Sequence, residues 1–139
     1  METLTRSKMK NAPALCGLWD NNPGALVYAV DPAFKALIHR DTKAFLRNFA
    51  LKEMGLAPGT FEVRSNLGGV AVTGEVTLHT DTVYIQVSGW GTGFAVLYRT
   101  CKGRKDYTGG FNRWSTFTSA FGTSDDRETF AKILANMRG

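Results

Sequence analysis

The chain has 139 residues, 43% of them hydrophobic and 21% charged, which is the composition of one folded domain and excludes a disordered segment. Lys and Arg number 17 and Asp and Glu 12, and the net charge of +5 favours partners that carry negative charge. Cys16 and Cys101 are too few for a disulfide framework, and no apolar run approaches the ~18 residues of a membrane span. We therefore expect a cytoplasmic protein with two free thiols and no membrane contact.

The first thirty residues carry few structural signals. Residues 1–12 are polar, and we expect either a flexible arm or a short helix that ends at Pro13. A turn signal at 21–24 precedes residues 25–30, which have the composition of a short strand. Three large apolar residues between these segments should pack onto the domain: Leu15, Leu18 and Trp19.

Residues 32–54 predict an amphipathic helix. Asp31 is a suitable N-cap, Pro32 suits the first helical position, and Gly55 suits the end. Asp41 lies within the apolar face, so either the helix breaks there and Asp41 caps a second helix, or Asp41 is a buried acid with a partner. The capping chemistry of Asp-Thr favours the break. The apolar face comprises Phe34, Leu37, Ile38, Phe45 and Phe49, and the opposite face carries a secondary basic stripe of Arg40, Lys43 and Arg47.

From Thr60 the hydrophobic period changes to two, which is typical of strands. The alternation indicates three strands: 61–64, 70–79 and 83–88. Residues 94–101 are apolar on both faces at their start, so we place this strand inside the sheet, and 114–121 can add a fifth. A two-residue turn at 80–81 would pair Thr77 with Tyr84. Five polar residues would then share one solvent-exposed face: Glu75, Thr77, His79, Tyr84 and Gln86.

A last helix is predicted near the end of the chain. Thr123 and Asp126 have capping-box spacing, and the apolar residues that follow are Phe130, Ile133, Leu134 and Met137. The order of elements predicts a single α+β domain over residues 1–139. It would contain an antiparallel sheet of four to five strands, with an N-terminal-half helix (or two short helices) and a C-terminal helix packed on one face.

Most of the net charge falls within 99–113, which carries five basic residues and one acid. Cations neutralise phosphates, aromatic faces stack on unpaired bases, and Gly103, Gly109 and Gly110 allow close approach to a backbone. Because no basic recognition helix is evident, the pattern predicts a nucleic-acid partner, single-stranded by preference. We expect the loop at 99–114, here called the basic loop, to make these contacts. The predicted contacts are Arg99, Lys102, Arg104, Lys105, Tyr107 and Arg113, with Trp90 and Tyr84 beside them.

Two other interpretations of the same residues stay open. Trp, Tyr and Arg are also the usual anchors of protein interfaces, so the loop and the Gly-Trp-Gly tip at Trp90 could serve a protein-binding inhibitor or adaptor, either regulatory or from a mobile element. Alternatively the loop is purely structural, with Phe111 and Trp114 entering the core. Salt separates the first alternative from nucleic-acid binding, because phosphate contacts weaken steeply as salt rises.

Catalysis has only weak signals. The candidate acid–base pairs are Asp106 with Tyr107 and Glu75 with His79, and such pairs are common on surfaces without chemistry. Cys101 alternates with core residues, so it is a poor candidate nucleophile. No metal-binding spacing is present, and the glycines at 89–93 are followed by a strand where a phosphate loop needs a helix. An enzyme of unrecognised type that uses Asp106, Tyr107 or His79 stays open as a third interpretation. We favour binding without catalysis, and we expect no cofactor or metal.

Overall fold

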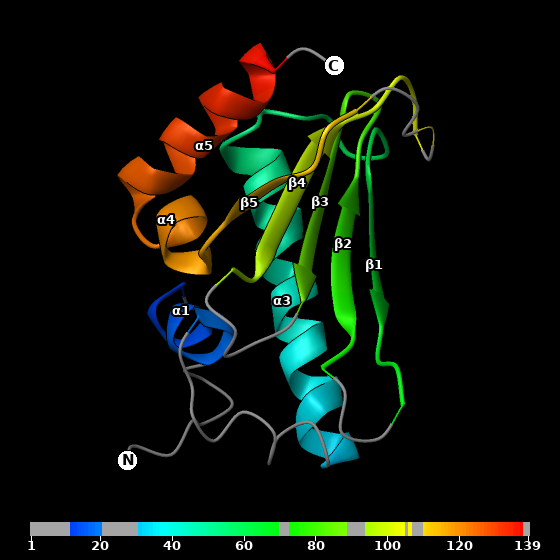
Figure 1. The fold of residues 1–139 in the computed structure, drawn as a ribbon, viewed down its shortest axis with the longest axis vertical. Coiled ribbons are helices and arrows are strands. Elements are labelled where there is room, and N and C mark those ends of the chain that lie inside the picture. Colours follow the sequence, from blue (N-terminus) through cyan, green and yellow to red (C-terminus); the bar gives the residue numbers. More distant parts are fainter. Residues whose placement is uncertain are drawn as a thin grey trace.

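The computed structural model describes residues 12–20, 31–69, 73–88, 94–104, 106 and 110–137, with the backbone alone at 12–14 and 17. A five-stranded antiparallel sheet forms one layer and helices cover one of its faces (Figure 1). This arrangement confirms the predicted α+β class. In chain order the elements are α1 (Ala12–Asp20), α3 (Pro32–Lys52), β1 (Glu62–Asn66), β2 (Glu75–His79), β3 (Val83–Ser88), β4 (Val96–Thr100), β5 (Arg113–Ser115), α4 (Phe117–Phe121) and α5 (Ser124–Asn136).

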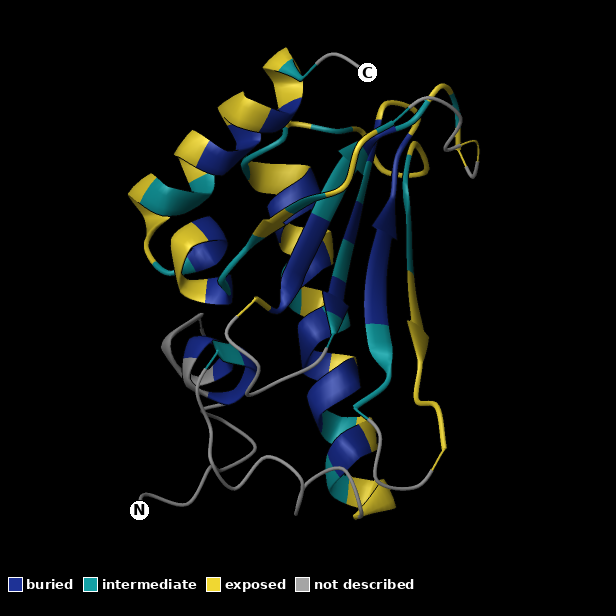
Figure 2. Cartoon of the chain, viewed as in Figure 1, coloured by how far each residue is buried: buried dark blue, intermediate teal, exposed yellow. Residues whose placement is uncertain are grey.

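The strands are neighbours in the same order in which they occur in the sequence, from β1 at one edge to β5 at the other. Along β3 the buried residues Val83, Ile85 and Val87 alternate with half-buried Tyr84 and Gln86, so one face of the sheet belongs to the core. The buried residues of the sheet and the helices form one core cluster, and Figure 2 shows dark blue along the inner strands and in bands on the helices. β4 has a neighbour on each side, as predicted.

The N-terminal helix α1 is held by its large side chains. Leu15, Leu18 and Trp19 are at most 1% exposed, which confirms their predicted packing, and Trp19 Nε1 donates to Thr42 Oγ1 of α3 at 3.2 Å. Pro13, which one of the two alternatives placed at the end of a helix, lies in the first turn of α1, where an N–H has no helical partner to lose. Residues 1–11 and 21–30, with the expected arm and short strand, lie outside the described residues.

Helix α3 begins where the sequence predicts and ends at Lys52, two residues before the predicted end at Met54. Asp31 Oδ1 accepts a hydrogen bond from Phe34 N at 3.2 Å, and Gly55 follows the helix with φ +68°. The preferred break at Asp41 is wrong, because the helix is continuous through it. Asp41 is instead the buried acid, 2% exposed, and its Oδ1 accepts from Arg40 Nη2 at 3.0 Å. Burial of apolar residues on both sides of Asp41 outweighs its local capping preference.

The hairpin between β2 and β3 turns one residue later than predicted. Thr80 N donates to the Val83 carbonyl at 3.0 Å, so the two central turn residues are 81 and 82. The Thr80 hydroxyl accepts from the Thr82 and Val83 amides, which places Thr80 at the end of the strand. Thr77 therefore pairs with Gln86, and its predicted pairing with Tyr84 is wrong. Strand β2 is also shorter than predicted and follows Gly74, while residues 70–72 lie outside the described part.

The expected fifth strand is mostly helix. β5 covers only Arg113–Ser115, and α4 occupies Phe117–Phe121. The Thr116 side chain accepts from Ser119 N and caps α4, while Phe117 and Phe121 are one turn apart and both 0% exposed. Helix spacing of two buried aromatics thus overrides the strand propensity of the segment.

The centre of the core is a cluster of aromatic rings from α3, α4 and α5. Phe121 contacts Phe45, Phe49, Phe117 and Phe130 with ring centroids 4.9–5.4 Å apart. The Thr123–Asp126 capping box of α5 is present as predicted. None of the described helices has both the length and the apolar character that crossing a membrane requires.

Candidate nucleic-acid interface

The face of the sheet opposite the core is here called the open face, and it is the face toward the viewer in Figure 1. Alternation along the strands assigns its residues, because they are the ones between those that point to the helices. The open face consists of Glu62, Arg64 and Asn66 of β1, Glu75, Thr77 and His79 of β2, Tyr84, Gln86 and Ser88 of β3, Leu97 and Arg99 of β4, and Trp114 of β5.

Polar side chains at the centre of the open face bind one another along the strands. His79 Nε2 lies 2.8 Å from Thr77 Oγ1, and the Tyr84 hydroxyl donates to Gln86 Oε1 at 2.8 Å. The rings of His79 and Tyr84 are 5.2 Å apart, as cross-strand partners should be. The five predicted polar residues do share this face, but it is not uniformly solvent-exposed: Thr77 and His79 are only 6% and 8% exposed.

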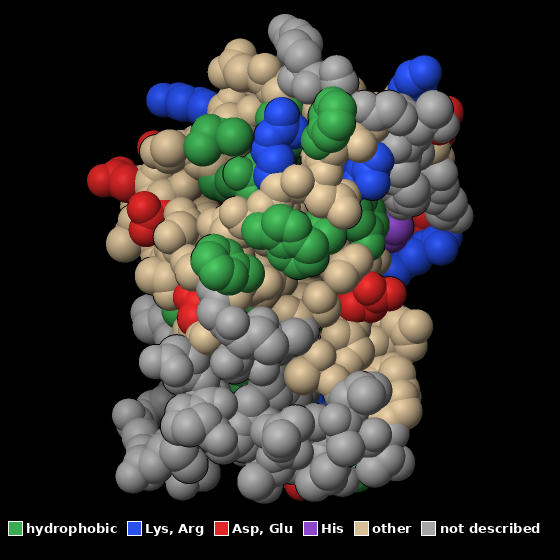
Figure 3. Space-filling view, in the orientation of Figure 1, with side chains coloured by type: hydrophobic (Ala, Val, Ile, Leu, Met, Phe, Trp, Pro, Cys, Tyr) green, Lys and Arg blue, Asp and Glu red, His purple; other side chains and the backbone are tan. Residues whose placement is uncertain are grey.

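Large aromatic side chains in and beside β4 and β5 are exposed. Trp114 is 55% exposed, Phe111 70% and Phe94 62%. The interpretation in which Phe111 and Trp114 enter the core is therefore wrong. Trp114 stands beside its cross-strand partner Leu97, which is 8% exposed. Figure 3 shows hydrophobic side chains gathered on this face, with Lys and Arg side chains beside them. An exposed tryptophan next to apolar surface is typical of a binding site.

Arg99 lies in the same cross-strand row as Tyr84, so the structure brings these two predicted contacts together. Its Nη1 donates to Asn112 Oδ1 at 3.1 Å and its Nη2 to the Gly110 carbonyl at 2.9 Å. A Cβ on Gly110 would lie 2.5 Å from the Thr100 carbonyl oxygen and 2.9 Å from Arg99 Nη2, which explains the glycine. Arg99 therefore holds the segment after the loop against β4, and its guanidinium is fixed in place.

The rest of the basic loop is described in part. A tight turn is closed by two 2.9 Å hydrogen bonds, from Lys102 N to the Asp106 carbonyl and from Asp106 N to the Gly103 carbonyl. Arg104 Nε lies 3.7 Å from Asp81 Oδ1, and because the Asp81 side chain is 70% exposed this ion pair adds little stability. Three further predicted contacts, Lys105, Tyr107 and Trp90, lie outside the described residues.

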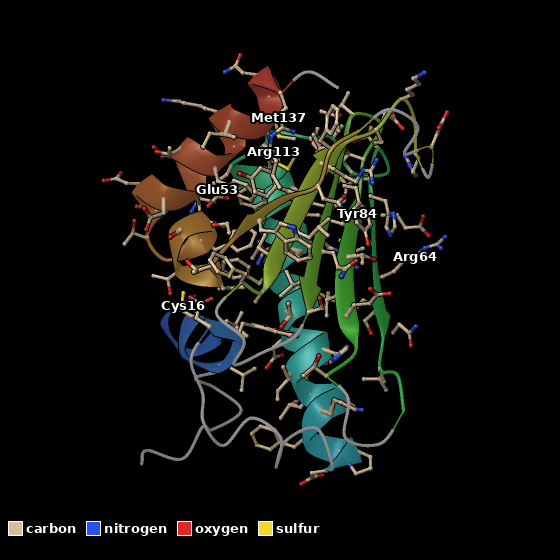
Figure 4. All side chains as sticks on the ribbon, viewed as in Figure 1. Cys16, Glu53, Arg64, Tyr84, Arg113 and Met137 are labelled. Carbon is tan, nitrogen blue, oxygen red and sulfur yellow. The ribbon has the colours of Figure 1, made fainter. Side chains whose placement is uncertain are left out.

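Arg113 and the basic stripe lie elsewhere. Arg113 pairs with Tyr98, whose ring packs on Phe130 of α5, so it points to the helix side of β5, and Figure 4 shows it beside Met137. The stripe of Arg40, Lys43 and Arg47 belongs to α3, on the far side of the sheet from the open face. Sequence reasoning thus grouped residues that the fold separates. It omitted Arg64 and Trp114 from the predicted contacts, although strand alternation places both on the open face.

Of the two candidate acid–base pairs, Asp106 with Tyr107 lies partly outside the described residues, and Glu75 with His79 does not assemble. Glu75 and His79 are four residues apart on one strand, which separates their backbones by about 13 Å. Burial raises the pKa of the Cys101 thiol, and Asp81 and Asp106 act in the same direction, so the nucleophilic thiolate is disfavoured. No three potential metal ligands gather anywhere in the described residues.

The open face thus combines exposed and half-buried aromatic rings, an arginine held by hydrogen bonds and a hydrogen-bonded polar centre. Comparison of the chain with protein-family models, with curated proteins and with solved structures finds no match in any of the three.

Proposed function

We propose that the protein is a small nucleic-acid-binding accessory protein that holds unpaired bases on the open face and contacts phosphates with the basic loop. The observation that carries the proposal is Trp114, which is 55% exposed on an antiparallel sheet beside Leu97. It lies two residues along the strand from the row of Tyr84 and Arg99. An exposed indole is hydrophobic surface that a stacked base would cover.

Single-stranded partners suit this surface better than duplexes. Base stacking on an aromatic ring requires an unpaired base, whereas a duplex presents its phosphates and groove edges. The polar side chains of Tyr84 and Gln86 are fixed by hydrogen bonds and would be available to base edges at little entropic cost. Lys102 and Arg104 beyond the sheet would neutralise phosphates, since both are exposed.

The test is binding of labelled single-stranded and duplex DNA and RNA, measured by fluorescence anisotropy at low and moderate salt. Trp114→Ala should weaken single-strand binding about 5- to 150-fold, the equivalent of one lost stacking contact. Leu51→Ala is the matched control, because Leu51 is an exposed apolar residue, 36% accessible, on α3. Absence of wild-type binding to all four nucleic acids at low salt would refute the proposal.

The second candidate is a protein-binding inhibitor or adaptor that uses the same surface. The observation in its favour is the exposure of three aromatics in or beside β4 and β5, Phe94, Phe111 and Trp114, because exposed aromatics are typical anchors of interfaces. Arg104→Ala discriminates between the two. In nucleic-acid binding, this variant should lower the slope of log affinity against log salt by the amount that about one phosphate contact contributes. The affinity of an aromatic protein interface would change little with salt.

A further inference from the structure

A groove lies outside the open face, between β5 and the C-terminal half of α5. It has a volume of about 620 Å³. Figure 4 shows Arg113 and Met137 side by side at this position. The groove is lined by Arg113, Thr129, Lys132, Ile133, Asn136 and Met137.

The groove is positively charged. Arg113 and Lys132 are its charged residues, and none of the six lining residues, all of them described, is acidic. The Nη1 atom of Arg113 is buried and has no hydrogen-bond partner within the described part of the chain. A buried donor without an acceptor is destabilising, so a ligand oxygen that met this atom when the side chain turned toward the groove would be favourable.

The chemistry of the lining selects an oxyanion. The planar guanidinium of Arg113 presents paired donors that match two oxygens of a phosphate, and the Lys132 ammonium adds charge from the facing helix. The Thr129 hydroxyl is a further donor. Ile133, 45% exposed although it belongs to the predicted apolar face of α5, gives one wall an apolar surface that would contact a sugar or other carbon groups.

We propose that this groove binds a phosphate group, and that in the nucleic-acid complex it is a backbone phosphate next to the base stacked on Trp114. The second clause rests on the function proposed above. Adjacent residues of a strand point to opposite faces, so Arg113 and Trp114 straddle β5, which is the last strand of the described sheet. A single strand that crosses this edge would place its base on one side and its phosphate on the other.

The first arm of the test uses inorganic phosphate at constant ionic strength, followed by the NMR signals of arginine side-chain N–H groups. Phosphate should shift the Arg113 signal, and Arg113→Gln and Lys132→Ala should each weaken phosphate binding about tenfold. Lys132 is exposed, so its replacement reports on binding even if Arg113→Gln perturbs folding. Absence of a phosphate-dependent shift in the wild type would overturn the groove as a phosphate site.

The second arm uses a short single-stranded oligonucleotide and measures affinity as a function of salt. Lys132→Ala should lower the slope of log affinity against log salt by about 0.7, the value for one lost phosphate contact, while Trp114→Ala should weaken affinity and leave the slope unchanged. Arg47→Gln on α3 is the matched control and should change neither the affinity nor the slope.

If Trp114→Ala weakens binding but Lys132→Ala and Arg113→Gln leave the slope intact, the strand path is wrong and the proposed function survives. If the wild type binds no oligonucleotide, the function fails, and the inorganic phosphate arm decides the groove alone.

Discussion

Asp20 provides a test of how the N-terminal helix supports the rest of the fold. Its carboxylate accepts hydrogen bonds from Phe117 N, from Thr118 N at 2.7 Å and from the Thr118 hydroxyl, across a sequence separation of 97 to 98 residues. These two amides are at the start of α4, where they have no partner within the helix. Asp20 thus ties the end of α1 to the segment that directly follows β5.

Asp20→Ala removes all three hydrogen bonds. Each hydrogen bond is made to a charged group but is partly exposed, so we assign it about 1 kcal/mol. The free energy of unfolding should therefore fall by about 2–3 kcal/mol. For a domain of this length that corresponds to a fall in Tm of about 6–12 °C. Asp20→Asn keeps one acceptor oxygen and should lose about half as much. Equilibrium urea denaturation measures both variants.

A double-mutant cycle with Thr118→Ala isolates the hydroxyl contact, and we expect a coupling free energy of about 1 kcal/mol. Asp81→Ala is the matched control, because Asp81 is 70% exposed and its removal should change stability by less than about 0.5 kcal/mol. Zero coupling would show that the hydroxyl contact contributes nothing. A loss for Asp20→Ala no larger than that of the control would show that α1 does not stabilise α4 through this carboxylate.

Three further predictions concern the core and its polar contacts. Burial lowers the pKa of His39 below its ordinary 6.5, and nearby Lys35 acts in the same direction. As pH falls, the unfolded chain therefore takes up a proton before the folded chain does, and the urea midpoint should fall as pH drops below about 6.5. His39→Gln should flatten that pH dependence. Phe121→Ala, at a 0% exposed site, should lower the free energy of unfolding by about 3–5 kcal/mol, whereas Phe94→Ala, at a 62% exposed site, should lower it by less than about 1 kcal/mol in the same assay. Gly74→Ala should lower Tm far more than Gly59→Ala: both glycines have positive φ, but a Cβ on Gly74 would lie 2.2 Å from the Asn66 carbonyl oxygen, while Gly59 has open space.

Elements whose local chemistry agrees with their packing were predictable from the sequence. Helix α3 has an Asp-Pro start and a glycine after its end, and α5 has its capping box, so their boundaries can be predicted to within a few residues. The alternation of β3 is equally clear, because its buried and half-buried residues alternate without exception. In these segments the cap, the period and the buried face all indicate the same structure.

Errors arose where two local signals competed and a distant contact decided between them. Asp41 has good capping chemistry, but a break there would disturb burial of Ile38 and Leu46, both 0% exposed. The segment after β5 reads as a strand by propensity, yet Asp20 from the other end of the chain supplies acceptors for the amides of α4. Neither outcome follows from a local window of residues, because the deciding partner is remote in sequence.

The candidate site shows the same limit in a form that bears on function. The charge cluster at 99–113 is continuous in the sequence, but the fold divides it by strand alternation: Arg99 belongs to the open face and Arg113 to the groove beside α5. A shift of one residue in the β2–β3 turn changes each cross-strand partner by two positions. Because side chains alternate between faces with a period of two, every side chain stayed on its predicted face. Face assignment is therefore more robust than pairing, and Trp114 could have been placed on the open face by counting outward from Leu97. A ligand that bridges the two faces at β5 would have to contact both Arg113 and Trp114, which are adjacent in sequence and point to opposite faces of the sheet.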